Sequence, residues 1–432
     1  MRVRPLVLLL LVAVALGACD TGGGDAPAPT SRPSPAITRA ELEQHLEALQ
    51  RIAGRNGGNR SAGTPGYDES ADYVAARLTD AGWDVSRQAV PFTLFRLRRA
   101  SLSVGGRSLT RGKEFQVLSY SGSGRSAGRL RASGHGCSAG DFAGLESGEV
   151  PLVDRSRCFF REKAAAAKRA GAKALVVVES VRTRRGVPSG TLVTQGIGIP
   201  VVLTSVRALG GAGDGSPVSV SVEATSRRSP TENVIAETPG GTGDRVVMAG
   251  GHLDSVAGGP GIEDNGTGAA ALIEAAEAIG PRPPGARVRI ALWTAEELGL
   301  LGSRRYVSSL DRSDRRRIAA YLNLDMVGSP NAVPQLYGDG DERIARVLRG
   351  AARGRLGETS AGTASDHTYF QLEGIPVNGL YTGSTEAGRD GRARDPCYHL
   401  ACDTLDNVDR TVLVRMARTA ARALSALSAQ AK

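Results

Sequence analysis

Two histidines and three carboxylates, spread over about a third of the chain, have the residue types and local contexts of one metal site. These candidate ligands are His252, Asp264, Glu297, Asp325 and His399. Two imidazoles together with three carboxylates supply the mixed nitrogen and oxygen ligation that suits a pair of zinc ions. Glu296, which precedes one of the candidates, is then left to handle protons.

Hydrolysis is the reaction that such a pair of ions supports. Two zinc ions about 3.5–4 Å apart can hold and acidify a shared water while they polarise a substrate carbonyl. The water's proton needs a base that can later protonate the leaving amine, and Glu296 is the candidate for both steps. Tyr398 is a candidate donor to the oxyanion, and Asp254 could accept a hydrogen bond from the far nitrogen of His252.

Three apolar runs lead into candidate ligands, and we predict that they are buried strands. They cover 245–252, 287–294 and 318–325, and their valine and isoleucine residues favour strands over helices. Helical stretches at 268–279 and 299–310 lie between them. This alternation predicts an α/β fold with a mostly parallel central sheet flanked by helices. Sites in such sheets collect at the carboxyl ends of strands, where three of the five candidates stand.

The local sequences around these residues resemble the secreted di-zinc aminopeptidases of bacteria and fungi, of the aminopeptidase S and aminopeptidase Y type. The resemblance is carried by His-Leu-Asp at 252–254, Glu-Asp-Asn-Gly at 263–266, Glu-Glu at 296–297, Asn-Leu-Asp at 323–325, Cys-Tyr-His at 397–399 and the segment 56–67. It implies a zinc exopeptidase fold in which His252 and Asp325 hold one zinc, while Glu297 and His399 hold the other. Asp264 would bridge the two ions, and the peptide bond after it would be cis.

The middle of the chain carries a second resemblance, to the protease-associated domain. Its motifs are the segments 150–163, 164–178 and 198–203. We therefore predict a discontinuous catalytic domain at 37–100 and 227–432 with a small α/β protease-associated insert at 101–226, which ends near a turn at 226–230. The resemblance implies a non-catalytic lid or substrate-access module, and a purely structural insert stays open.

The first residues predict export. Arg2 and Arg4 precede an apolar stretch at 6–16 that is too short to span a membrane, and it ends in the lipobox-like Leu-Gly-Ala-Cys19. We predict a lipoprotein signal peptide at 1–18, lipid on Cys19 and a tether at 19–36 rich in small and polar residues. The product would face outward on the cell membrane. An ordinary secretory signal that happens to contain cysteine is the alternative.

The cysteine count agrees with export. Removing Cys19 from the five cysteines leaves four, an even number that suits two disulfides. Cys397 and Cys402 bracket His399 and would hold it in a small loop. Cys137 and Cys158 form the remaining pair.

Composition sets limits on partners. The net charge is +10, but the basic residues are dispersed along the sequence and aromatics make up only 4% of it, so we expect no nucleic-acid partner. We expect a monomer. Among the other histidines, His45 lies on an amphipathic helix pattern, His135 lies in a Gly-rich loop, and His367 resembles a family residue near the substrate pocket without being a ligand.

We predict an exported zinc metallo-aminopeptidase, a hydrolase that removes N-terminal residues from peptides and prefers apolar ones. The exopeptidase activity and the apolar preference come from the resemblance, whereas the residues alone imply metal-assisted hydrolysis. Three alternatives stay open: a glutaminyl cyclase-like acyl transferase around one zinc, a carboxypeptidase for acidic dipeptides, and a non-catalytic receptor-type binding module. Lost ligands would mark the last of these, and none of the five is lost.

Overall fold

The computed structural model describes residues 36–179, 187–188, 190–193, 196–360, 365–388 and 391–431. The predicted signal peptide and Cys19 lie outside these described residues, as does all of the predicted tether except its last residue. In the described part of the chain, no helix combines the length and the apolar character needed to cross a membrane.

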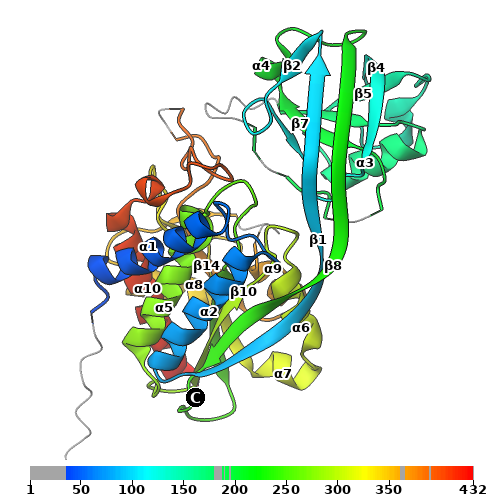
Figure 1. The fold of residues 1–432 in the computed structure, drawn as a ribbon. Helices are drawn as coiled ribbons and strands as arrows, with labels where there is room; N and C mark the ends of the chain where they lie inside the picture. Colours follow the sequence, from blue (N-terminus) through cyan, green and yellow to red (C-terminus); the bar gives the residue numbers. More distant parts are fainter. Residues whose placement is uncertain are drawn as a thin grey trace, which may run out of the picture. The chain divides into compact units, whose positions relative to one another are not determined.

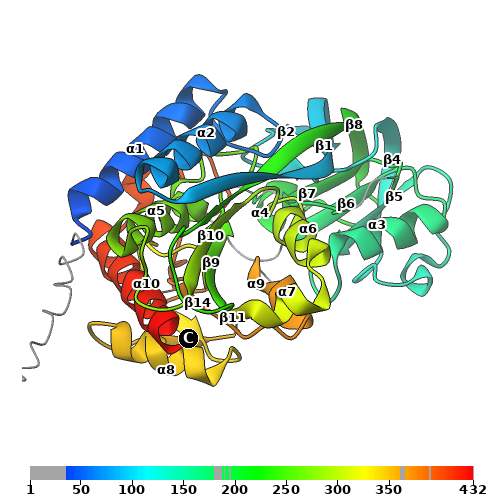
Figure 2. The same cartoon turned by 90° about the horizontal axis from the view of Figure 1, so that it is seen from below.

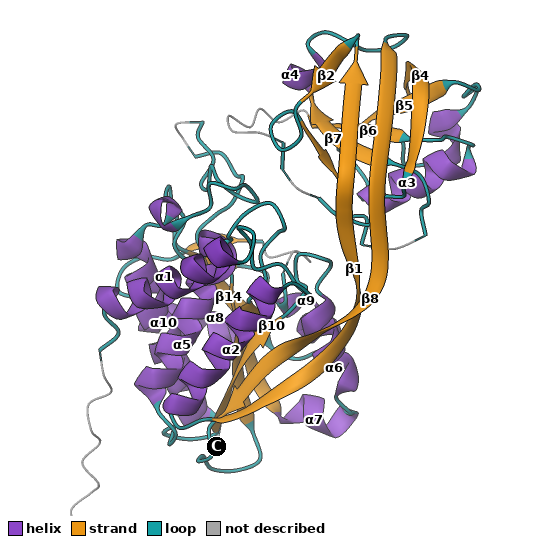
Figure 3. Cartoon of the chain, viewed as in Figure 1, coloured by secondary structure: helices purple, strands orange, loops and turns teal. Residues whose placement is uncertain are grey.

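The catalytic domain is built around a sheet with helices packed on it (Figures 1 and 3). Four parallel strands form the centre of this sheet, in the order β14-β11-β9-β10. Their bounds are Val246–His252 for β9, Arg287–Trp293 for β10, Ile318–Leu324 for β11 and Val377–Tyr381 for β14. The first three match the strands predicted from the apolar runs to within one residue. Because the three strands are parallel, their carboxyl ends meet at one edge, and the residues that follow them are brought together there.

Helices cover both faces of this central sheet (Figure 2). Alternate residues of a strand point to opposite faces, so Val247 and Ala249 of β9 pack into one hydrophobic core while Val246 and Met248 pack into another. The first core is completed by helices α1 (Arg39–Arg55), α2 (Pro65–Asp80), α5 (Thr267–Ile279), α8 (Glu342–Ala351) and α10 (Arg410–Gln430). The second core includes residues of α6 (Leu301–Ser309) and α9 (His367–Leu372).

The two edges of the central sheet differ in direction, which makes the whole sheet mixed. On one side β12 (Gln335–Tyr337) pairs antiparallel with β14 and parallel with β13 (Gly357–Thr359). On the other side β10 pairs antiparallel with β8 (Pro217–Glu237). The short helix α7 (Arg312–Arg317) leads into β11.

Two 21-residue strands connect the catalytic domain to the insert. Strand β1 (Asp84–Val104) pairs antiparallel with β8 from Asp84 opposite Glu237 to Val104 opposite Val218. The predicted turn at 226–230 is wrong, because these residues lie inside β8, opposite residues 91–95 of β1. Their polar side chains looked like a turn, but a two-stranded ribbon with open faces accepts polar residues on both sides.

The insert has its own small parallel sheet, which pairs with the far end of β8. Strands β4 (Gly124–Ala132), β5 (Glu149–Asp154), β6 (Leu175–Glu179) and β7 (Val201–Ser205) are parallel neighbours in that order. Helix α3 (Phe160–Arg169) lies between β5 and β6 in sequence, and α4 (Val206–Leu209) follows β7. The short strands β2 (Arg107–Leu109) and β3 (Phe115–Val117) pair with β1 and β7.

Candidate metal centre

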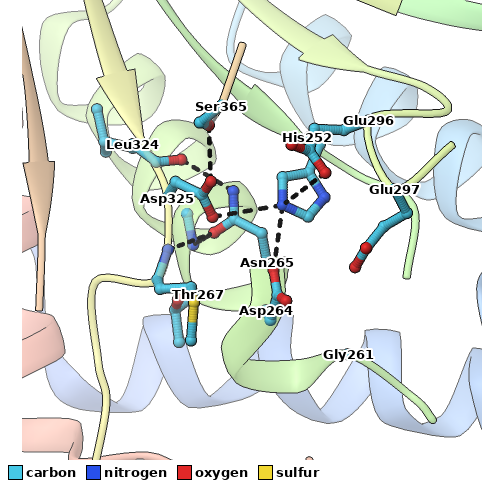
Figure 4. A network of polar contacts seen from close by, with 12 residues as sticks. His252, Gly261, Asp264, Asn265, Thr267, Glu296, Glu297, Leu324, Asp325 and Ser365 are labelled. Carbon is cyan, nitrogen blue, oxygen red and sulfur yellow. Dashed lines mark hydrogen bonds and ion pairs between the residues drawn. The ribbon is translucent and has the colours of Figure 1, made fainter. Parts of the chain in front are cut away.

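The five candidate ligands lie together at the carboxyl ends of the parallel strands. The Nε2 atom of His252 lies 3.1 Å from Asp264 Oδ1 and 3.3 Å from Asp325 Oδ1. The Nε2 atom of His399 lies 3.0 Å from both Asp264 Oδ2 and Glu297 Oε2. The two carboxylate oxygens of Asp264 therefore face one imidazole each. Figure 4 shows the His252 side of this cluster.

Two sets of three side chains share Asp264 and could each hold a metal ion, and a third group, of His252, Glu296 and Glu297, overlaps both. One set is His252, Asp264 and Asp325, and the other is Asp264, Glu297 and His399. The members of each set offer ligand atoms within 4.8 Å of one another. Asp264 belongs to both sets, so the geometry is that of two adjoining sites with one shared carboxylate.

The segment that carries Asp264 is fixed from several sides. The Asp264–Asn265 peptide bond is cis, as the resemblance predicted. The side chain of Asn265 donates to the carbonyl of Leu324 at 2.9 Å and accepts from the amides of Gly268 and Met326 (Figure 4). This one amide therefore ties the segment to the end of β11 and to the first turn of α5.

Glu296 lies beside the first set. Its Oε2 atom is 4.0 Å from His252 Nε2, and its side chain is only 12% exposed. The Nδ1 atom of His252 is 3.0 Å from the backbone carbonyl of Asp254, which fixes the tautomer with the proton on Nδ1. The acceptor in Asp254 is thus its backbone carbonyl, whereas its carboxylate Oδ1 lies 4.0 Å from Nδ1 and accepts from the amide of Glu296 at 3.1 Å. Asp254 thus positions both the imidazole and the backbone of Glu296.

His399 is held by the loop that the cysteines close. The disulfides Cys397–Cys402 and Cys137–Cys158 are both present, as predicted. The His399 backbone has a φ of 57°, in the left-handed region that costs a residue other than glycine about 1 kcal/mol or more. The Tyr398 ring stacks on the His399 imidazole with 3.8 Å between ring centroids, and it lines the same pocket as the cluster.

The electrostatics of the cluster favour a bound cation. Burial raises the pKa of Glu296 well above its ordinary value, and it raises the pKa of Glu297 as well. Burial also opposes a charge on His399, but the carboxylates of Glu297 and Asp264 outweigh it and raise the pKa of that imidazole well above its ordinary value. Buried carboxylates that crowd together in this way are stabilised by a divalent cation.

Comparison with known proteins agrees with this geometry. The profile of peptidase family M28 matches residues 233–424, and that of the PA domain matches residues 126–209. A Mycobacterium tuberculosis protein named probable lipoprotein aminopeptidase LpqL is 37% identical over 418 residues, which cover 87% of this chain and 82% of the relative. The chain belongs to peptidase family M28. An aminopeptidase of Pseudomonas aeruginosa is also 37% identical, over 422 residues that cover 87% of this M28 chain and 78% of the Pseudomonas protein.

A solved structure extends the likeness of this M28 peptidase to the whole fold. The zinc aminopeptidase BSAP from Bacillus subtilis superposes with a TM-score of 0.74 at 26% sequence identity, over 91% of this chain and 96% of that one. The predicted family, the α/β fold with a PA insert, and the enzyme class of metallopeptidase are therefore confirmed.

The residues of the M28 centre fit zinc on chemical grounds. Imidazole nitrogen and carboxylate oxygen are ordinary zinc ligands. The Oε1 atom of Glu297 is buried without a hydrogen-bond partner, although Oε2 of the same carboxylate faces His399. A buried carboxylate oxygen normally has a partner, so a cation between these groups would explain this one.

Two residues that were not predicted as part of the site hold the M28 centre in place. Arg60 is fully buried and donates to the carbonyls of Leu253, Pro260 and Gly261, all in the loop between His252 and Asp264. The Asp403 carboxylate accepts from the amides of Glu263 and Asp264 at 2.9 Å and 3.1 Å. Arg60 lies in the segment 56–67 that carried part of the family resemblance, and this was the one available hint.

The remaining histidines of the M28 peptidase lie outside the ligand sets. His45 is buried in α1, where its ring nitrogens contact Tyr73 Oη at 2.7 Å and Glu274 Oε1 at 3.0 Å, which confirms a structural role. His135 Nδ1 lies 2.5 Å from Asp154 Oδ2 in the insert. His367 is buried against the Tyr337 ring and lines the pocket of the metal centre, as predicted.

Proposed function

We propose that this M28 peptidase is a zinc aminopeptidase that works with two zinc ions. His252 and Asp325 would hold one ion, Glu297 and His399 the other, and Asp264 would bridge them. The observation that carries the proposal is the position of Asp264, whose two oxygens face His252 and His399 separately. The aminopeptidase activity of the relatives and of BSAP supports the reaction.

The chain's own residues divide the work of peptide hydrolysis. Zinc bound here would polarise the scissile carbonyl and lower the pKa of water. Glu296 accepts the proton of the attacking water and returns it to the leaving amine, and its position beside His252 suits both steps.

Tyr398 would stabilise the developing oxyanion. Its ring is fixed by stacking on His399, and it faces the pocket that the cluster lines. Burial raises the pKa of its hydroxyl well above the ordinary value, so the phenol keeps its proton and donates a hydrogen bond throughout the working pH range.

Metal removal tests the proposal directly. We expect chelation to abolish hydrolysis of amino-acid amides, and zinc to restore it with two ions per chain by elemental analysis. A single ion per chain, with cyclisation of N-terminal glutamine in place of amide hydrolysis, would contradict the proposal and favour an acyl transferase. Release of C-terminal residues from peptides with blocked N-termini would contradict it in favour of a carboxypeptidase.

The pocket beside the centre suggests which side chains it admits. The resemblance predicts apolar N-terminal residues, and this preference stays a prediction. The pocket of about 190 Å³ that contains His252 and Asp325 also reaches Glu386. The Glu386 carboxylate is held by Tyr381 Oη at 2.8 Å and by the amide of Ser384 at 2.6 Å. We therefore propose that the pocket accepts the apolar stem of the substrate's N-terminal side chain and favours a positive charge at the end of that side chain.

Lysine and norleucine test the role of Glu386, because norleucine shares the four-carbon stem of lysine and lacks the ammonium group. We expect lysine amide to have the higher kcat/KM. The substitution Glu386→Gln should reduce this advantage about twofold to fivefold, the range for an exposed ion pair, with the norleucine rate unchanged. An equal fall for both substrates would show that Glu386 only shapes the loop.

We also propose that the enzyme acts as a monomer anchored to the outer face of the cell membrane by lipid on Cys19. The lipobox-like sequence before Cys19 supports this, as does the word lipoprotein in the name of the relative LpqL. Labelling with a radioactive fatty acid, compared between the chain and its Cys19→Ser variant, checks the attachment.

A further inference from the structure

Arginines gather on one face of the catalytic domain, away from the residues assigned to chemistry. A cleft of about 390 Å³ lies between the start of α1, helix α10 and the segment after α8. Six of the eight residues that line it are arginines and none is acidic: Arg39, Arg353, Arg410, Arg415, Arg418 and Arg422. A second cleft shares Arg422 and adds Arg343 and Arg346. We call these eight arginines the arginine face.

The positive charge of this face is largely uncompensated. Arg39 and Arg410 share a single carboxylate, Glu43, at 2.9 Å each. Four others, Arg353, Arg415, Arg418 and Arg422, form no ion pair with any carboxylate in the described part of the chain. The contacts recorded for Arg415, Arg418 and Arg422 are to backbone carbonyls, and the buried Nε of Arg415 has no hydrogen-bond partner. Guanidinium groups arranged in this way bind phosphate oxygens well.

The chain enters the catalytic domain at the same place. Arg418 donates from Nε and Nη2 to the carbonyl of Ile37, at 2.9 Å and 2.7 Å, and Ile37 is the first buried residue of the described chain. Ile37 follows the proposed lipid site, Cys19, by 18 residues. A chain of this length cannot exceed about 65 Å even when fully extended, so the arginine face stays within reach of the anchoring bilayer.

We propose that the arginine face docks on the anionic phosphate headgroups of the membrane to which the chain is anchored. Each arginine near an anionic bilayer raises the affinity of a protein for the bilayer surface about fivefold. Several arginines together therefore hold a tethered domain against the surface. The attraction is electrostatic and falls with salt. Docking of this kind does not depend on the peptidase activity.

Vesicle sedimentation tests the proposal. The chain from residue 19 onward, which lacks the apolar signal peptide and carries Cys19→Ser, is mixed with vesicles of phosphatidylcholine alone or with added phosphatidylglycerol. We expect binding only to the anionic vesicles and its loss at high salt. The variant R346Q/R353Q/R422Q should bind about 100-fold more weakly, because three contributions of about fivefold are removed. Its hydrolysis of amino-acid amides should be unchanged.

The control variant removes the same charge elsewhere. Arg245, Arg312 and Arg316 are exposed and line neither cleft, so R245Q/R312Q/R316Q should bind the anionic vesicles as the parent does. An equal loss in this control would overturn the proposal in favour of general attraction by net charge. Release by millimolar inorganic phosphate at constant ionic strength would overturn it in favour of a site for free anions.

Discussion

Replacing Glu296 with glutamine is expected to lower kcat by about 10²–10⁴-fold while the zinc content per chain stays at that of the parent. The substitution keeps the shape of the side chain and removes its ability to take a proton. Glu296 lies 4.0 Å from His252 Nε2, beside the proposed ligands without being needed as one. Single-turnover rates on an amino-acid amide, together with elemental analysis of the same samples, measure both quantities.

The neighbouring residue provides the matched control. Glu297→Gln makes the same chemical change one position along the chain, but Glu297 Oε2 lies 3.0 Å from His399 Nε2, and Glu297 belongs to the second set of proposed ligands. This variant should lose zinc together with activity, and added zinc should recover part of the rate. If Glu296→Gln lost zinc in proportion to its activity, Glu296 would act as a zinc ligand, and its assignment as the general base would be wrong.

The residues that the sequence placed well are those that follow regular strands. His252 ends β9 and Asp325 follows β11, and the apolar runs before them are recognisable because buried parallel strands require valine, isoleucine and alanine at consecutive positions. Asp264 and His399 lie in irregular segments with no periodicity to read. Their residue types, their short local motifs and the resemblance to relatives pointed to them, and no strand or helix pattern did.

What could not be predicted depends on hydrogen bonds between distant segments. Whether the Asp254 carboxylate or its backbone carbonyl faces His252 is a choice between acceptors 4.0 Å and 3.0 Å from the same nitrogen. The long β1–β8 ribbon was missed for a different reason. Its polar residues at 226–230 have the composition of a turn, and only pairing with a strand more than 130 positions away makes them extended.

Arg60 is the clearest case of a residue that sequence reasoning leaves out, because arginine is almost never fully buried. Its guanidinium donates to three carbonyls in the loop between His252 and Asp264. Burial lowers its pKa to about 10, which still leaves it charged at neutral pH. The loop has no regular secondary structure of its own, so these bonds replace the backbone pairing that a strand or helix would provide.

Replacing Arg60 with leucine should therefore lower the free energy of unfolding by about 2–6 kcal/mol. The carbonyls of Leu253 and Pro260 lose their partner at about 1–3 kcal/mol each, while the Gly261 carbonyl keeps the amide of Gly266. That is a large part of the roughly 5–15 kcal/mol that stabilises a typical protein. Arg60→Lys keeps the charge, but its three N–H donors sit on one nitrogen and cannot reach the acceptors that Nε, Nη1 and Nη2 serve separately, so its stability should fall between those of the parent and Arg60→Leu. Urea unfolding of the zinc-loaded proteins measures the loss of stability. Zinc titration of the folded variants should show weaker binding, because the loop positions two of the proposed ligands.

The control variant is Arg55→Leu. Arg55 forms an exposed ion pair with Glu69, so this substitution should change neither the free energy of unfolding nor zinc binding noticeably. If Arg60→Leu matched the parent in both measurements, the loop would have to be held by contacts other than this guanidinium.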